Sequence, residues 1–397
     1  MDDQKETISI QITSGISIEV KLTNPMDEVL SVEEFFKQLP PNITNNITTQ
    51  LEHLYSDIRK CDYPILPQFL ALIYMKLCKI KYLTDLHRRL CADGSKLAEK
   101  LGFRRKNGKV EIPSYKNLWN FMKIRLKEEY IDDLSTITLK ELDKEISSRN
   151  VVLAGKIGHD GIAVRSHDKE ARYNDHYKMT MYKGEVGFDL DLLIPLHGVV
   201  TTGTDYDGNY LIPFAERIDG INKQHRILYA DGHYPTIRNL AVLNHVYRWR
   251  TVMNIPVDQR IISEDGKEDN IDKWYQKLHT KEDFIIGATV NDKLSVLMKY
   301  GRIDEVGYYY RNIYVSEYFN NPETYDKDYH NRSLEETGNN CLKNGLVDIE
   351  NACNGTGLRN RNLHLKLCIL AVQLVAVTRA KHGVADRKMV SIQNIAC

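Results

Sequence analysis

The sequence predicts an α/β protein in which a sheet-containing region follows a helical N-terminal domain. In residues 1–150, apolar residues recur at three- and four-residue spacing between Pro and Gly signals, as in amphipathic helices. From residue 151 onwards, short runs of β-branched and aromatic residues end at Gly, Asn or Asp and alternate with helical patterns, as in α/β folds. The 397 residues, 42% of them hydrophobic, are enough for two or three domains with a sizeable core.

The N-terminal domain is expected to contain helices over residues 32–37, 43–60, 67–79, 83–102 and 115–129. Ser114 is placed to cap the last of them. Between Lys96 and Lys127 there are ten Lys or Arg residues and two acids, and the densest part of this run is Arg104, Arg105 and Lys106. A basic helical unit with interleaved aromatic residues is suited to docking on a DNA duplex. A helix with core aromatic residues and solvated cations is equally compatible with the sequence.

Three further regions follow along the chain. In residues 151–234 we expect strands over 151–155, 158–164, 177–182, 192–202 and 226–230, and a helix over 210–218. Residues 235–328 form a mixed segment, with helices over 236–250 and around Trp274 and strands over 284–288 and 306–317. Helices return in residues 329–397, at Tyr329 and over 363–379. The α/β core is therefore expected to be split into 151–234 and 329–397.

Composition restricts the function classes only loosely. Lys+Arg and Asp+Glu both number 54, so the overall charge predicts no polyanion partner and any nucleic-acid surface must come from local clustering. Seven cysteines without a CxxC pair disfavour a disulfide framework and a zinc knuckle, and favour a reducing, cytoplasmic setting. The N-terminus is polar, and the most apolar stretch carries Lys366 and Gln373, so we expect no signal peptide and no membrane anchor.

The most informative pattern is formed by Tyr329, Arg332, Glu336 and Lys343, at offsets of 3, 7 and 14 residues from the tyrosine. At about 100° per residue these offsets fall within about 60° of one another, so a regular helix would place all four side chains on one face. An acid beside two phosphate-binding cations is typical of metal-dependent phosphodiester chemistry. The alternative is a solvated charged stripe, which is what most charged helix faces are.

Two aspartates extend this pattern. Asp160 lies in a predicted strand, and Asp231 follows a buried one. Carboxylates at strand ends could meet Glu336 at the carboxyl edge of the sheet, where α/β folds commonly place their sites. Three carboxylates could hold two Mg²⁺ ions, which stabilise the attacking and leaving oxygens of an in-line displacement. Taken alone, an Asp before Gly is more often a turn residue.

These residues resemble the DDE insertion-sequence transposases, specifically the cut-and-paste branch with a Tyr-Arg-Glu-Lys signature. Tyr329, Arg332, Glu336 and Lys343 match the spacing of that signature without adjustment. His159-Asp160-Gly161 resembles the first acidic motif, residues 182–205 resemble the second and third strands, and Asp231-Gly-His-Tyr234 resembles the second acidic motif. Residues 66–121 are similar, less specifically, to the DNA-binding region of the family. The resemblance covers about two-thirds of the chain.

The resemblance implies an RNase H-like catalytic domain with a β-rich subdomain inserted between Asp231 and Glu336. It implies that Asp160, Asp231 and Glu336 ligate Mg²⁺, with Mn²⁺ as a substitute, to cut double-stranded DNA at the element ends and join the 3′-hydroxyls to target DNA. Tyr329, Arg332 and Lys343 would hold phosphates. The protein would work as a homodimer on DNA, in a prokaryotic cytoplasm and associated with the nucleoid.

Several alternatives stay open at this stage. Glu335 competes with Glu336 for the metal role from about 100° round the helix, and Gly338 with its neighbours could bend the helix before Lys343. Asp160 also has competitors, in Asp168, Asp175, Asp189 and Asp191. The aromatic residue that stacks a flipped base could be Trp249, Trp274 or one of Tyr308, Tyr309 and Tyr310, although a core role is more usual for each. A Mg²⁺-dependent nuclease without strand transfer and a non-enzymatic, transposase-derived DNA-binding protein are the competing functions.

Overall fold

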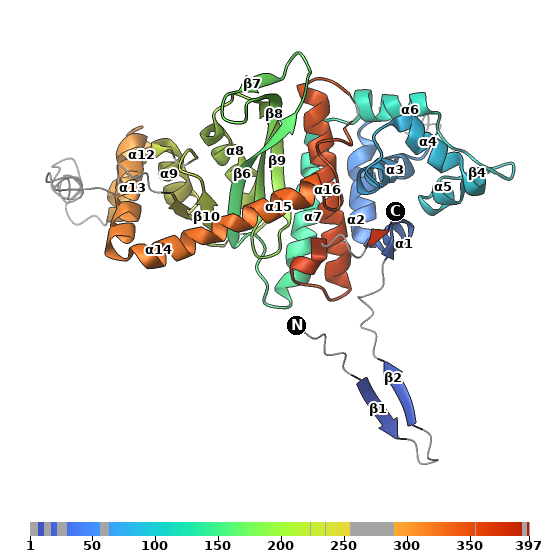
Figure 1. Cartoon of the computed structure of the whole chain (residues 1–397), viewed down its shortest axis with the longest axis horizontal. Coiled ribbons are helices and arrows are strands. Elements are labelled where there is room, and N and C mark those ends of the chain that lie inside the picture. Colours follow the sequence, from blue (N-terminus) through green and yellow to red (C-terminus); the bar gives the residue numbers. More distant parts are fainter. Residues whose placement is uncertain are drawn as a thin grey trace.

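The computed structural model shows a mixed β-sheet flanked by helices and joined to a helical N-terminal unit (Figure 1). It describes residues 7–11, 17–21, 30–55, 63–222, 224–234, 236–254, 290–353, 355–390 and 395–396. The coarse prediction of an α/β protein is confirmed.

The central sheet contains six strands: five follow the order β11-β10-β6-β8-β9, and the sixth, β7 (Arg172–Asn174), pairs with the start of β8. Their bounds are Lys156–Arg165 for β6, Met179–Asp189 for β8, Pro195–Thr202 for β9, Ile227–Ala230 for β10 and Arg250–Met253 for β11. β6, β8 and β9 are antiparallel, whereas β10 runs parallel to β6 and β11 parallel to β10. The carboxyl ends of β10 and β11 therefore lie at the same edge of the sheet.

Helices cover both faces of this sheet. α15 (Leu334–Lys343) and α16 (Leu358–Lys381) pack on one face, where a Cβ on Gly338 would lie 2.8 Å from the ring of Phe188. α8 (Leu211–Asp219) packs on the other, where the ring of Phe214 fills the space that a side chain at position 187 would need. The glycines thus allow close approach of the helices to the sheet.

α16 is the central helix of the protein, and its side chains from Asn362 to Ala380 are buried. By length and composition it could cross a membrane, but its apolar window lies entirely inside the fold. It packs against β9, α7 and α3, as Figure 1 shows. A helix that is apolar all round is expected wherever it is surrounded by other elements.

The N-terminal unit is mostly helical, as predicted. Its helices are α1 (Val32–Gln38), α2 (Pro41–Glu52), α3 (Ile65–Leu77), α4 (Leu83–Cys91), α5 (Lys96–Lys100), α6 (Tyr115–Asn120) and α7 (Glu128–Ser147). Ser114 caps α6, because its hydroxyl accepts a hydrogen bond from the amide of Asn117 at 3.3 Å. Short strands accompany the helices: β1 (Thr7–Gln11) with β2 (Ser17–Lys21), β3 (Leu30–Ser31) with β12 (Ile395–Ala396), and β4 (Arg105–Lys106) with β5 (Lys109–Val110).

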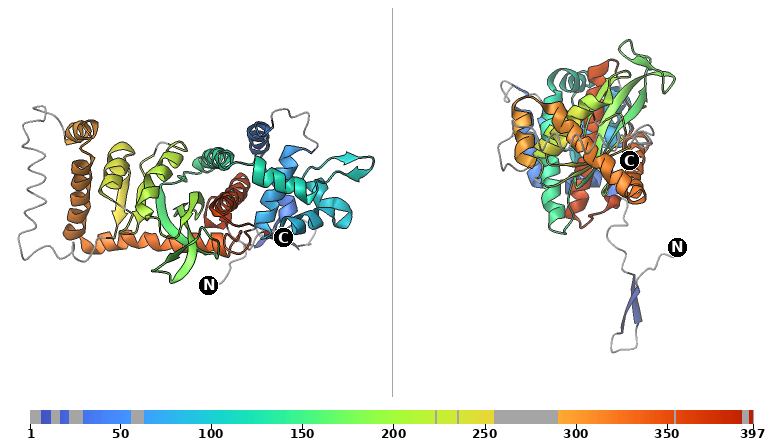
Figure 2. Two further views of the ribbon diagram at one scale, coloured as in Figure 1. Left: turned by 90° about the horizontal axis from the view of Figure 1, so that it is seen from above. Right: turned by 90° about the vertical axis from the view of Figure 1, so that its left-hand side faces the viewer.

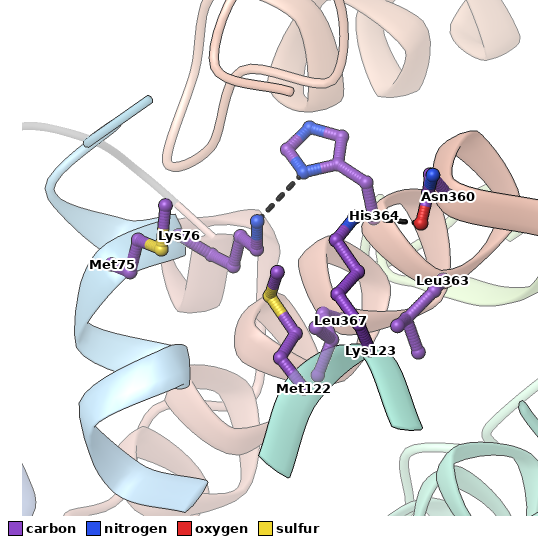
Figure 3. Close-up of a pocket in the computed structure, with 8 residues that line it drawn as sticks. All are labelled: Met75, Lys76, Met122, Lys123, Asn360, Leu363, His364 and Leu367. Atoms are coloured by element: carbon purple, nitrogen blue, oxygen red, sulfur yellow. Dashed lines mark hydrogen bonds between the residues drawn. The ribbon is translucent and has the colours of Figure 1, made fainter. Parts of the chain in front are cut away.

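The N-terminal unit is joined to α16 by buried polar contacts around a small cavity (Figure 3). The Lys76 amine lies 2.8 Å from Nδ1 of His364, and the Lys123 amine donates to Asn360 at 2.6 Å. Burial lowers the pKa of Lys76 and lowers that of Lys123 to about 8. The cavity has a volume of about 10 Å³, enough for about one water molecule, so we assign it a structural role at this junction.

Three expectations about secondary structure were wrong. Residues 151–155 form a turn, with Ala154 at a φ of 58°, and β6 begins only at Lys156. Residues 306–317 lie in helix α13 (Ile303–Asn320), because Val306, Tyr310 and Tyr314 recur every four residues and pack on one side. The predicted helix over 236–250 is shorter: α9 (Ile237–Ala241) continues as a π-helical turn to Val246, and Arg250 starts β11.

The insertion is therefore not β-rich in its described part. Apart from β11, its described elements are helical: α12 (Val290–Lys299) and α14 (Pro322–Tyr329), in addition to α9 with its π-helical turn and α13. The expected strand over 284–288 and helix around Trp274 fall outside the described residues. Helix α7 was not predicted, although Ile131, Leu134, Leu142 and Ile146 follow a helical period and are buried.

Asp189, the last residue of β8, fixes the turn that follows β8 and the turn that precedes β6. Its carboxylate accepts hydrogen bonds from the amides of Ala154 and Leu192, both at 2.6 Å. The side chain is fully buried, and burial raises its pKa to about 7. Asp189 stands opposite Ile157 of β6 and not opposite Asp160. We therefore assign it a structural role.

We predict that Asp189→Ala lowers the free energy of unfolding by about 2–4 kcal/mol, because two buried amides lose their acceptor. Asp191→Ala is the matched control. Asp191 is 49% exposed and pairs with Lys156 at 3.4 Å, so its loss should cost less than about 1 kcal/mol. Urea denaturation measures both values, and equal losses would contradict the structural role of Asp189.

Candidate active site

Asp160 and Asp231 come together on neighbouring strands. Asp160 lies in the middle of β6, and Asp231 follows directly after Ala230, the last residue of β10. β10 pairs in parallel with β6, so that Ala230 stands opposite His159, the residue before Asp160. The register therefore places the two carboxylates side by side, although only Asp231 lies at the end of a strand.

The third carboxylate at this position is Glu335. Its side chain is 1% exposed, and its Oε1 would lie 2.6 Å from a Cβ on Gly158. Gly158 is two residues before Asp160, and on a strand these residues share one face. Glycine at position 158 thus makes room for the Glu335 carboxylate beside Asp160.

Glu336, which we expected at this position, lies on the exposed side of α15. The reason is the 3₁₀ turn over His330–Ser333, between α14 and α15. A 3₁₀ turn advances about 120° per residue, so side chains three apart become eclipsed. Arg332 is consequently aligned with Glu335, and the expected alignment of Arg332 with Glu336 is lost.

Arg332 lies among the three carboxylates. Its Nη2 is 3.8 Å from Oδ1 of Asp160 and 3.5 Å from Oδ2 of Asp231, and its Nε is 3.5 Å from Oε2 of Glu335. At these separations the contacts are ion pairs with poor hydrogen-bond geometry. The guanidinium supplies the positive charge that opposes repulsion among the acids.

Tyr329 and Asn339 complete the face that α14 and α15 turn towards the sheet. Asn339 donates from Nδ2 to Oδ2 of Asp160 at 3.1 Å. The Tyr329 phenol is half-buried. Burial raises its pKa above the ordinary value, and the adjacent Arg332 offsets part of this increase. The predicted proximity of Tyr329 and Arg332 to the acids is present, and Asn339 is a residue that the sequence analysis missed.

The carboxylates are held in an environment that opposes their ionisation. Burial raises the pKa of Glu335 well above its usual range, and the charge of Asp160 raises it further. Burial also raises the pKa of Asp160, while Arg332 lowers it. Among the described residues, neither oxygen of Glu335 has a hydrogen-bond partner of normal geometry. Arg332 is therefore the cation that opposes repulsion among the three acids, and its contacts with them are ion pairs rather than hydrogen bonds of normal geometry.

The remaining predicted residues lie away from the acids. Lys343 is the last residue of α15 and is half-buried. Arg104, Arg105 and Lys106 lie exposed at the β4–β5 hairpin, which projects at the end of the molecule opposite to α12–α14 (Figure 2). Arg105 pairs with Glu99, and Lys106 lies 3.6 Å from Glu111. This hairpin could contact a duplex only at a distance from the carboxylates.

The donor set fits a hard divalent cation. Carboxylate oxygens are the ligands that Mg²⁺ and Mn²⁺ prefer, and the buried carboxylate of Glu335 has an ion pair with Arg332 but no side-chain hydrogen bond of normal geometry within the described residues. In their present positions, no three His, Cys, Asp or Glu side chains of the described residues are close enough to share one ion. Arg332 occupies the space between the acids, so binding of an ion requires this side chain to move.

No protein-family model matches the chain, and neither a curated protein nor a solved structure matches it.

We predict that Arg332→Gln lowers the melting temperature in EDTA and increases the gain in melting temperature on adding Mn²⁺. The substitution removes the cation that opposes repulsion among the acids and that competes with the ion. A tenfold tighter binding would add about 1–2 °C to the gain for a chain of this length. Thermal unfolding with and without Mn²⁺ measures both effects.

Arg302→Gln is the matched control, because Arg302 is 33% exposed and pairs with Glu305 on α13. It should leave the Mn²⁺ gain unchanged. An identical gain in Arg332→Gln and wild type would show that Arg332 and the ion do not compete.

Proposed function

We propose that this protein is a DDE-type DNA transposase, which cuts the ends of a mobile element and joins the 3′-hydroxyls to target DNA. The observation that carries the proposal is the convergence of Asp160, Asp231 and Glu335 around Arg332, next to the carboxyl end of β10. The residues come from three separate parts of the chain. Their types are those that two-metal phosphodiester chemistry requires.

The order of the strands supports an RNase H-like core within this proposal. Three antiparallel strands, β6, β8 and β9, are followed by β10 and β11, which extend the sheet in parallel on the other side of β6. The acids are placed on the first and fourth of these strands and on a helix that packs against the first. The insertion at 235–328 separates the second acid from the third along the chain.

Each residue has a role that follows from its position. Asp160, Asp231 and Glu335 would hold Mg²⁺, or Mn²⁺ in its place; when bound, the ions lower the pKa of water and neutralise charge at the phosphate. Asn339 orients the Asp160 carboxylate through its hydrogen bond. Tyr329 beside the acids, and the Arg332 guanidinium once the ion has displaced it, would bind phosphate oxygens of the DNA backbone.

The protein is further proposed to act in the cytoplasm of a prokaryote, as a homodimer on paired DNA ends. The basic hairpin at Arg104, Arg105 and Lys106 would bind the duplex outside the cleavage point. Lys343 would contribute a more distant phosphate contact, since it lies at the far end of α15.

We predict that Glu335→Gln abolishes Mg²⁺-dependent end cleavage, with a loss of at least 100-fold, whereas Glu336→Gln keeps activity within about threefold. Only Glu335 is directed at Asp160, and exposed Glu336 is its matched control on the same helix. The substrate is a DNA fragment that carries the gene with its flanking sequences. Full activity of Glu335→Gln would contradict the assignment.

The same assay separates the competing functions. Joining of 3′-hydroxyl ends to a supercoiled target supports a transposase, and cleavage without joining would indicate a Mg²⁺-dependent nuclease. If the wild-type protein, which carries all three acids, binds DNA but does not cleave it, the result would indicate a non-enzymatic DNA-binding protein.

We predict that replacing Arg104, Arg105 and Lys106 together by Ala weakens duplex binding and lowers the dependence of log K on log salt by roughly 2–3, because up to three phosphate contacts are lost. Replacing the exposed Lys140, Lys144 and Lys381 together is the control of equal charge. Fluorescence anisotropy at several salt concentrations measures both. Equal weakening in the two variants would exclude a specific role for the hairpin.

A further inference from the structure

A second buried polar cluster lies on the face of the sheet opposite to Glu335. It consists of Lys183 and Glu185 on β8, Asp207 in the 3₁₀ turn that follows β9, and Tyr234 after β10. The Lys183 amine pairs with Asp207 and lies 3.2 Å from Oε1 of Glu185. The Tyr234 hydroxyl donates to Oε2 of Glu185 at 2.7 Å. None of these side chains takes part in the chemistry proposed above.

The cluster lies directly behind Asp160. On β6, Gly161 stands opposite Glu185, and a Cβ at position 161 would collide with Lys183 and lie 3.4 Å from the Tyr234 hydroxyl. The Tyr234 ring also packs edge-on against His159, with ring centroids 5.1 Å apart. Tyr234 therefore contacts the residues on both sides of Asp160, across a gap that glycine at 161 leaves open.

Tyr234 belongs to the segment that carries Asp231. Its amide donates to the carbonyl of Asp231 at 3.0 Å, and the two residues are only three apart. Burial of the Tyr234 side chain, which is 1% exposed, leaves little room for the segment to shift. The hydroxyl of Tyr206 holds the same segment from outside by donating to the carbonyl of His233 at 2.7 Å.

We propose that Tyr234, held by Glu185 and Lys183, is a positioning residue that sets the distance between Asp231 and Asp160. Asp231 is 39% exposed and lies beyond the end of β10, so the backbone hydrogen bonds between the strands do not fix its position. The hydrogen bond from Tyr234 to β8, together with its packing on His159, ties the Asp231 segment to the strands beside Asp160. Tyr206 adds a second, weaker tie.

This inference rests on the proposed function, because it concerns the distance between two metal ligands. Residues that orient metal ligands typically change metal affinity by 10–100-fold when they are replaced. Loss of the Tyr234 hydroxyl should therefore weaken Mn²⁺ binding even without DNA. A residue that only stabilises the fold would lower the melting temperature and leave the affinity unchanged.

The test is Mn²⁺ binding to the full-length protein without DNA, followed by the electron paramagnetic resonance signal of free Mn²⁺. Tyr234→Phe is expected to weaken binding about tenfold, and Tyr206→Phe, at a half-exposed position, to weaken it by a smaller factor. Tyr314→Phe is the matched control. It removes a hydroxyl of a side chain that is 4% exposed and that accepts from the Thr251 amide at 3.1 Å, outside the carboxylate cluster.

The expected result is that Tyr314→Phe loses thermal stability but binds Mn²⁺ like the wild type. Wild-type affinity in both Tyr234→Phe and Tyr206→Phe, or equal weakening in Tyr314→Phe, would overturn the positioning role alone. Asp160→Asn identifies the site: if it leaves wild-type Mn²⁺ binding intact, the proposed metal site fails, and the positioning role fails with it.

Discussion

The site depends on the burial of Glu335 against Gly158, beside Asp160. A carboxylate that is 1% exposed, next to a second one, is unfavourable unless a cation is present. In the structure this cation is the guanidinium of Arg332, at 3.5–3.8 Å from all three acids. Arg332 and the proposed divalent ion would therefore satisfy the same electrostatic requirement, and under the proposed function the displaced arginine would bind DNA phosphate.

The rest of the fold serves to hold the acids against this repulsion. Gly338 allows α15 to approach Phe188, and the 3₁₀ turn before it directs Arg332 and Glu335 to the same point. The contacts of α14 with the sheet support this turn from the other end. Tyr229 on β10 donates to Asp328 at 2.8 Å, and Arg250 on β11 pairs with the same carboxylate at 2.7 Å. Asp328 is the residue before Tyr329, so the two parallel strands fix the position of Tyr329 and of the turn that follows it.

Much of this arrangement follows from local sequence patterns. The strand around Asp160 and the buried strand before Asp231 have clear β patterns, and the two carboxylates were expected to converge. The choice between Glu335 and Glu336 was left open, because the alignment was worked out for a regular helix and the structure has a 3₁₀ turn over His330–Ser333. The strand expected over 306–317 was wrong because β-branched and aromatic residues favoured β structure, while the four-residue spacing of Val306, Tyr310 and Tyr314 favoured a helix that packs on one side. The pairing of Glu185 with Tyr234 depends on register between distant strands, which no single sequence reveals.

Asp160, Asp231 and Glu335 are proposed to form one metal site from which a bound ion displaces Arg332. The most direct measurement is anomalous diffraction from crystals of the protein soaked in Mn²⁺. We expect an anomalous peak within bonding distance of carboxylate oxygens of Asp160, Asp231 and Glu335, with the Arg332 guanidinium moved away from its place among them. A peak bound by Glu336 in place of Glu335, or no peak near Asp160, would contradict it.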